Sequence, residues 1–182
     1  HTHLTYSNIL GILTAQMSGT PVVATLHSSS VDTHLRDQLE TWLIRRGAAR
    51  ILAVGQSVAE AYQKRLFPRK INIIPNAVAD PVILSDKERI AIRSQVCGDP
   101  NRPLLISVGR LTEAKGYSDL IDACAILRQS HPEAALIIAG NGTLFRDLLE
   151  QIHRLCLQQN VFLLGARSDV PYLLAACDIY VN

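Results

Sequence analysis

The chain has 182 residues, of which 48% are hydrophobic and 19% are charged, and its formal net charge is +2. This length is enough for one ordinary domain or for parts of two. The balanced charge argues against a nucleic-acid-binding protein, and no apolar run reaches membrane-spanning length. Four widely spaced cysteines without a C-x-x-C pair argue against a zinc site and favour a reducing compartment.

Short apolar strands alternate with helical segments through the first 80 residues. Helical periodicity predicts three helices, over residues 5–18, 33–47 and 57–66. Apolar runs between them predict strands at residues 21–26, 51–54 and 71–74. The densest basic group of the chain, Arg45, Arg46 and Arg50, is interpreted as a solvated helix end.

The chain changes character at residues 77–103, which hold a polar helix-like piece near 85–96 and several turn-forming residues. We interpret this part as the connection into a second domain. Beyond it, strands are predicted at residues 104–108, 134–139, 161–164 and 178–182, and helices around 120–127, 144–155 and 170–176. The chain starts at His1 and its last strand has no following element, so we expect an internal piece of a longer protein.

Regular alternation of apolar strands and helices predicts an α/β protein with parallel sheets covered on both faces. Ligands bind such sheets beyond the carboxyl ends of the strands. The residues at those ends are His27, Gly55, Pro75-Asn76, Gly109-Arg110, Gly140-Asn141-Gly142 and Gly165.

The loop after the strand at 104–108 is the strongest candidate for a binding site. Its sequence places Gly109, Arg110, Lys115 and Gly116 between a strand and the start of a helix. Two cations beside helix N–H groups would bind a phosphate well, and each charge-assisted hydrogen bond is worth about 1.5–3 kcal/mol. From the spacing alone, an exposed loop with ordinary surface charges remains the alternative.

Two other strand ends carry weaker signals. Gly140-Asn141-Gly142 follows a strand, but Phe145 stands where the third glycine of a dinucleotide fingerprint would fall, which counts against a nicotinamide enzyme. His27 precedes Ser28, Ser29 and Ser30, and it is either a ligand contact or a histidine packed at a turn. Asp169 is predicted to cap a helix, and Cys124, Cys156 and Cys177 are predicted core residues.

Five stretches, in this order along the chain, resemble the retaining family 4 glycosyltransferases, whose fold is called GT-B. The first contains Val22 to His27, and the second, Ile73 to Val78, is similar to an I-P-N-G-V segment. The loop from Val108 to Gly116 resembles the donor-phosphate loop, and Ile137 to Gly142 resembles a G-D-G turn. Residues 161–181 resemble the stretch before the acidic donor motif. The chain departs from the family pattern at Ala77, Ala79, Asn141 and Gly55.

The resemblance implies two Rossmann-like domains, both incomplete in this chain. Residues 1–80 would be the C-terminal half of the acceptor-side domain, 81–102 a linker, and 103–182 the N-terminal half of the nucleotide-sugar domain. Arg110 and Lys115 would grip the donor diphosphate together with Gly109, Gly140 and Asn141. His27 would contact the transferred sugar, and no metal or other cofactor is expected.

The implied reaction transfers a sugar from a nucleotide-diphosphate-sugar to a glycan, lipid or small-molecule acceptor with retention of configuration. A nucleotide-sugar epimerase and a degenerate, non-catalytic binding module remain alternatives. The expected setting is polysaccharide biosynthesis in the cytoplasm, with peripheral contact at the inner membrane face left open because no basic amphipathic helix stands out. The piece alone is expected to be inactive.

Overall fold

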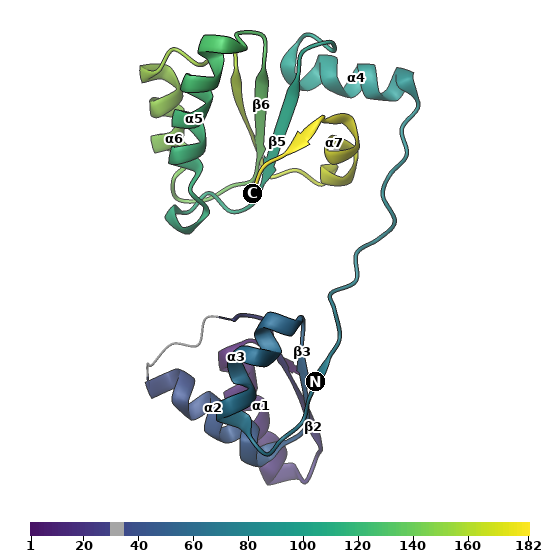
Figure 1. The fold of residues 1–182 in the computed structure, drawn as a ribbon, viewed down its shortest axis with the longest axis vertical. Helices are drawn as coiled ribbons and strands as arrows, with labels where there is room; N and C mark the ends of the chain where they lie inside the picture. Colours follow the sequence, from purple (N-terminus) through teal and green to yellow (C-terminus); the bar gives the residue numbers. More distant parts are fainter. Residues whose placement is uncertain (30–34) are drawn as a thin grey trace. The chain divides into compact units, whose positions relative to one another are not determined.

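The computed structural model describes residues 1–29 and 35–182 and divides into two compact units, His1–Ala79 and Asp80–Asn182. Each unit is described by itself (Figure 1). Ser30, His34 and the predicted helix start near Thr33 lie outside the described residues. None of the helices in the described part of the chain is long and apolar enough to span a bilayer.

Unit 1 is a parallel sheet whose strands follow one another in chain order, β1-β2-β3-β4. Because each crossover between parallel strands is right-handed, helices α1, α2 and α3 all cover the same face (Figure 1). Its core lies between that face and these helices, around Ile12, Ile44, Ile51 and Leu66. The elements are β1 (Thr2–His3), α1 (Thr5–Ser18), β2 (Val22–Leu26), α2 (Leu35–Gly47), β3 (Ala48–Ala53), α3 (Gln56–Leu66) and β4 (Ile71–Ile73).

Unit 2 is a parallel sheet in the order β7-β6-β5-β8, with helices on both faces. The chain moves outward from β5 to β6 and β7, and then returns through α7 to the other side of β5. Helices α5 and α6 therefore cover one face, and α4 and α7 the other (Figure 1). The elements are α4 (Asp86–Cys97), β5 (Leu104–Val108), the 3-10 turn η1 (Glu113–Lys115), α5 (Tyr117–Ser130), β6 (Ala135–Ala139), α6 (Phe145–Arg154), β7 (Val161–Gly165), α7 (Val170–Ala176) and β8 (Ile179–Tyr180).

The predicted α/β class with two parallel sheets is confirmed, and single elements differ from expectation. The two-residue strand β1 was not predicted, because so short a stretch carries no periodicity. Asp169 stands at the N-cap of α7, but its carboxylate accepts hydrogen bonds from Arg167 and does not cap the helix. Cys124 is buried as predicted, whereas Cys156 is exposed in a left-handed turn after α6, so that prediction was wrong.

The segment interpreted as a linker contains α4, and this helix belongs to unit 2. Ser85 and Glu88 form a capping box at its start, and Val96 and Cys97 at its end enter the core. Arg93 on the same helix is buried and donates to the carbonyls of Pro100 and Ala176 and to the carboxylate of Asp178. The helix is thus tied to the start of β8.

Asp178 is the anionic partner in this network. It accepts hydrogen bonds from Arg89 at 2.8 Å, from Arg93 at 3.1 Å and from the Leu104 amide at 2.8 Å. Burial by itself would raise the pKa of Asp178, but the hydrogen bonds from Arg93 and Leu104 outweigh it and hold that pKa below its usual value. One carboxylate therefore links α4, β5 and β8.

Replacing Arg93 with Met is expected to destabilise unit 2 by about 3 kcal/mol, because it leaves Asp178 and several carbonyl groups without their donor. Hydrogen exchange of the β5 amides measures this change, while the fluorescence of Trp42, the single tryptophan, monitors unit 1. Arg89→Met is the control. Its side chain is 45% exposed, and the expected loss is below about 1 kcal/mol. Equal losses in the two variants would contradict the prediction.

Candidate functional site

The loop that joins β5 to α5 is anchored at its middle by a buried side chain. Gly109 donates its backbone N–H to the carbonyl of Ala139 at 3.1 Å, and Leu111 is fully buried in the core of unit 2. Arg110 and Lys115, on either side of this anchor, are exposed. Neither forms an ion pair within the part of the chain that the structure describes. Both charges are therefore available to a ligand.

The glycine turn after β6, residues 140–142, packs directly against this loop. The amide of Leu111 donates to the carbonyl of Asn141 at 3.0 Å, and the amide of Leu144 donates to the carbonyl of Leu111 at 3.2 Å. A Cβ atom at Gly142 would stand 2.3 Å from the Leu111 oxygen, and one at Gly140 would stand 1.8 Å from the Gly109 oxygen. Both positions therefore require glycine because the two backbones touch.

Tyr117, the first residue of α5, lies beneath Gly109. A Cβ atom at Gly109 would be 2.8 Å from the Tyr117 hydroxyl, and Tyr117 is only 2% exposed. Burial raises the pKa of Tyr117, although a hydrogen bond with Ser107 opposes the shift. The phenol therefore stays protonated at neutral pH. No sequence pattern singled out this residue, because an aromatic side chain at the start of a helix is an ordinary core residue.

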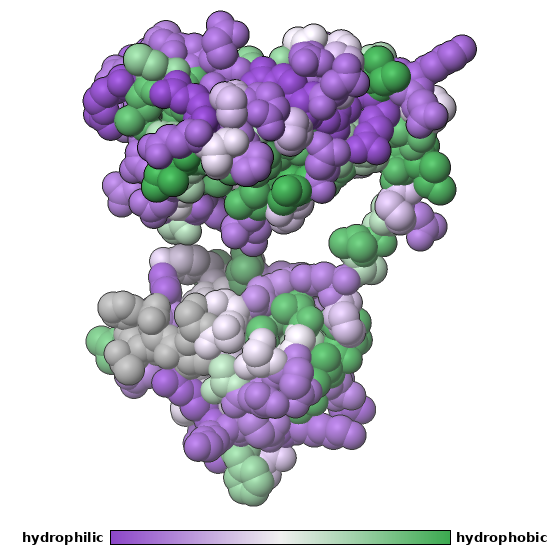
Figure 2. Space-filling model, turned by 45° about the horizontal axis from the view of Figure 1, so that its top comes forward, coloured by the Kyte–Doolittle hydropathy of each residue, from purple (hydrophilic) through white to green (hydrophobic). Residues whose placement is uncertain are grey.

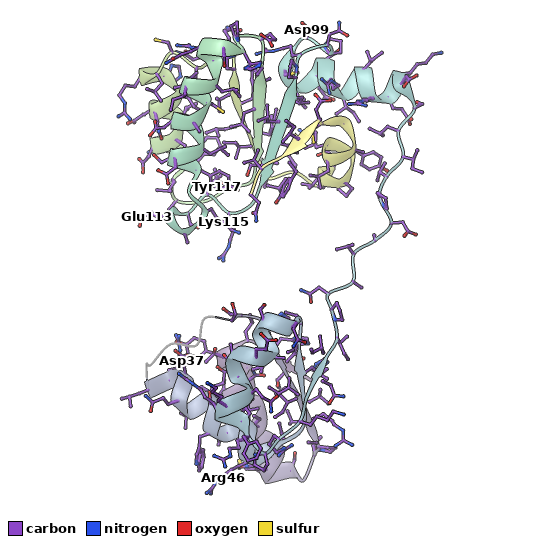
Figure 3. The ribbon with its side chains drawn as sticks, in the orientation of Figure 1. Asp37, Arg46, Asp99, Glu113, Lys115 and Tyr117 are labelled. Carbon is purple, nitrogen blue, oxygen red and sulfur yellow. The ribbon has the colours of Figure 1, made fainter. Side chains whose placement is uncertain are left out.

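A cavity of about 250 Å³ lies at the same edge of unit 2, and Ser107, Lys115, Gly116, Tyr117 and Leu120 contribute to its walls. Figure 3 shows Lys115 and Tyr117 at this edge. The edge lies between β5 and β8, where the direction of the strand order reverses, and α/β sheets bind ligands at such switch points. Lys115 therefore belongs to a cavity where the topology favours a ligand.

Asn141, the remaining predicted donor contact, is exposed at the tip of the glycine turn. Its side-chain oxygen accepts a hydrogen bond from the Gly142 amide at 2.9 Å. That bond fixes the turn locally. The structure thus brings the predicted residues Gly109, Gly140 and Asn141 together beside Arg110.

His27, the candidate in unit 1, follows β2 and belongs to a group of three histidines with His1 and His3, which stand before and at the end of β1. Its Nε2 lies 2.8 Å from Nδ1 of His3, and the rings of His3 and His1 are 4.2 Å apart. Nε2 of His1 in turn lies 2.6 Å from the hydroxyl of Thr25. From the sequence, His1 and His3 could flank a cleft, but their position at the start of the chain gave them little weight. Strand β1, which aligns them, was not predicted.

A second cavity, of about 300 Å³, adjoins His27. Its walls include Thr25 and the side chains of Asp37 and Glu40 from the first turns of α2. Both carboxylates are buried, and Glu40 accepts a hydrogen bond from Asn8 at 2.8 Å. The carboxylates of Asp37 and Glu40 therefore line a cavity at the strand ends of unit 1. Among the described residues, no three His, Cys, Asp or Glu side chains are grouped closely enough to hold a metal ion.

Family models match nearly the whole chain. Residues 88–182 match the model described as "Glycosyl transferases group 1", and residues 1–80 match the model described as "Glycosyltransferase Family 4". A cation-bearing loop at the switch point of a parallel sheet is consistent with that class. The chain belongs to the group 1 glycosyltransferase family, and its two parallel sheets match the GT-B fold.

Three similar proteins illustrate the match. A UDP-Gal:alpha-D-GlcNAc-diphosphoundecaprenol alpha-1,3-galactosyltransferase of Escherichia coli is 27% identical over 194 residues, covering 100% of this chain and 50% of that protein. An N-acetylgalactosaminyltransferase of Campylobacter jejuni, named for a diphospho-undecaprenol substrate, is 32% identical over 63% of this chain and 29% of its own length. The crystal structure of Anabaena HepE with UDP-glucose has a TM-score of 0.82 and 26% identity, and the match covers 97% of this chain and 50% of that one.

The chain spans about half the length of the curated relatives that match all of it. Arg110 and Lys115 come from unit 2, and His27 comes from unit 1. The roles assigned to these residues from the sequence stay predictions, as does the expectation that no metal is needed.

Gly142→Ala is expected to lower the stability of unit 2 by about 1–3 kcal/mol, because the new Cβ collides with the backbone of Leu111. It should also weaken nucleoside diphosphate binding, since the loop that carries Arg110 must shift. Thermal unfolding and calorimetric titration with UDP measure the two effects. Gly55→Ala is the control, because a Cβ atom there meets nothing within 4 Å and its extended backbone suits alanine. Unchanged stability in Gly142→Ala would contradict the packing argument.

Proposed function

We propose that the protein containing this chain transfers a sugar from a nucleotide-diphosphate-sugar to an acceptor hydroxyl, with retention of configuration. One observation supports this most: Lys115 lines a cavity at the switch point of unit 2, and Arg110 is an exposed cation of the same loop. Neither forms an ion pair with the residues that the structure describes. A diphosphate is the ligand that suits such a loop, because it offers several anionic oxygens to cations and backbone N–H groups.

Arg110 and Lys115 would act on the leaving group. During transfer, the bond between the anomeric carbon and the diphosphate oxygen breaks, and its electron pair goes to the diphosphate. The two cations stabilise the charge that develops there, which lowers the barrier without a metal ion. The acceptor oxygen bonds to the anomeric carbon from the same face, and its proton passes to the departing oxygen.

His27 would contact the transferred sugar from unit 1. Its bond with His3 holds the imidazole in one orientation, so that its other ring nitrogen can face a sugar hydroxyl. A fixed ring loses less conformational freedom on binding than a free one, and this favours a defined sugar position. We assign His27 a positioning contact with the sugar and His3 the support of its ring.

The relatives indicate the substrates to test first. The HepE structure contains UDP-glucose, and two relatives are named for acceptors or substrates linked to diphosphoundecaprenol. We infer a nucleotide-sugar donor and a glycan acceptor carried on a lipid diphosphate, used in polysaccharide assembly at the cytoplasmic membrane face. The matched relatives with assigned reactions are transferases or synthases, so neither an epimerase nor a non-catalytic module gains support.

Arg110→Ala and Lys115→Ala in the full-length protein should each weaken nucleoside diphosphate binding by about 10- to 100-fold, the equivalent of one charge-assisted hydrogen bond. Turnover should fall at least as much, because the charge is largest in the transition state. Titration with UDP, ADP and GDP identifies the base and measures the loss. Arg146→Ala, an exposed cation on α6, is the control and should bind like the wild type. A failure of the wild type to bind any of the three would overturn the proposed function.

His27→Ala should lower kcat by roughly 10- to 100-fold while leaving nucleoside diphosphate affinity unchanged, because His27 contacts the sugar and not the phosphates. The matched control is His153→Ala, which removes an exposed histidine of α6. Initial rates with the full-length protein, read as release of the nucleoside diphosphate, measure both. A loss of affinity without a loss of kcat would mean that His27 has another role.

A further inference from the structure

The two candidate cations stand at opposite ends of the loop over residues 109–116, which we call the cation loop. Arg110 follows the end of β5 by one residue, and Lys115 is the last residue of η1 before the start of α5. They can act on one diphosphate only if the strand-side and helix-side ends of the loop keep a constant separation. The strand-side end is fixed by the hydrogen bond from the Gly109 amide to the carbonyl of Ala139. The helix-side end needs a restraint of its own.

Tyr117 connects these two ends inside unit 2. It follows Lys115 by two residues, and its ring belongs to the buried core that also contains Leu111. Its hydroxyl forms a hydrogen bond with Ser107 of β5. The face of unit 2 in Figure 2 is largely hydrophilic, whereas Ser107 and Tyr117 are only 5% and 2% exposed. A buried polar pair therefore joins the last strand residues before the loop to the first helix residue after it.

Gly109 lies against the same hydroxyl. A Cβ atom at Gly109 would stand 2.8 Å from the Tyr117 oxygen and 3.7 Å from Cε of Lys115. Gly109 is not among the glycines with a left-handed backbone, so its conformation would suit any residue. The tyrosine cannot move aside easily, because its ring is packed in the core and its oxygen is bonded to Ser107. Glycine is therefore required at position 109 because the hydroxyl occupies the space of a side chain.

We propose that Tyr117 is a positioning residue of the donor site, whose hydroxyl holds the two ends of the cation loop at a fixed separation. Cations held in place stabilise the charge that develops on a leaving diphosphate without first having to reorganise. A role in packing alone would be met by phenylalanine, which fills the same space but leaves Ser107 without its partner. This inference rests on the proposed function, because Tyr117 acts through Arg110 and Lys115.

The first test is Tyr117→Phe in the full-length protein. We expect kcat to fall about tenfold, because a small displacement of the cations matters most in the transition state. Affinity for the nucleoside diphosphate should fall less, by about 2- to 10-fold, the equivalent of one neutral hydrogen bond. Release of the nucleoside diphosphate gives kcat, and titration with UDP, ADP or GDP, whichever the wild type binds, gives the affinity. Tyr172→Phe, a half-exposed tyrosine of α7, is the matched control and should behave like the wild type.

The second test introduces Gly109→Ala into the wild type and into Tyr117→Phe. In the wild type, the new Cβ collides with the hydroxyl, so we expect a lower Tm and nucleoside diphosphate binding weakened about tenfold. In Tyr117→Phe, the nearest atom of the ring is Cζ, 3.9 Å from the new Cβ, which is an ordinary contact. Alanine should then change affinity by less than about twofold. Such a rescue by phenylalanine is specific to the contact between the hydroxyl and position 109.

Two results would overturn this inference alone. If Tyr117→Phe retains the kcat and the affinity of the wild type, whatever its Tm, the hydroxyl does not position the cations. If Gly109→Ala is equally harmful in both backgrounds, the hydroxyl is not what requires glycine there. A wild-type protein that binds none of the three nucleotides would instead overturn the proposed function, and the positioning role with it. Wild-type binding without an effect at Tyr117 leaves the proposed function standing.

Discussion

The contact between two backbones determines the shape of the candidate donor site. The loop after β5 and the turn after β6 lie so close that Gly140 and Gly142 leave no room for a Cβ atom. The amide of Leu111 and the carbonyl of Asn141 join the two segments, and the buried side chain of Leu111 anchors the loop to the core. Arg110 and Lys115 thus extend from a fixed base, so little reorganisation is needed when a diphosphate arrives.

Much of this site could be predicted from the sequence, because its elements are local. The strand at 104–108, the glycine before Arg110 and the helix after Gly116 are contiguous, and the structure places them as expected. Tyr117 and His3 were missed for different reasons. Tyr117 matters only through its position under Gly109, and His3 only through the pairing of β1 with β2. Both depend on contacts that no local pattern encodes.

The segment before β5 illustrates the same limit at longer range. Its polar composition and its prolines indicate a connection, and the capping box of α4 was within reach of a sequence argument. The partner of Arg93, however, is Asp178, which lies 85 positions further along the chain. A buried guanidinium that satisfies one carboxylate and several carbonyls makes α4 a part of unit 2.

The histidine group of unit 1 depends on a long-range contact of the same kind. Strand β1 pairs in parallel with β2, which sets His3 opposite Thr25 and brings Nδ1 of His3 to within 2.8 Å of Nε2 of His27. Helix α1 begins directly after the turn that follows His3, and it packs on the sheet through Ile12. The orientation of the His27 ring therefore depends on how a neighbouring strand and its helix are held, which no pattern around His27 itself encodes.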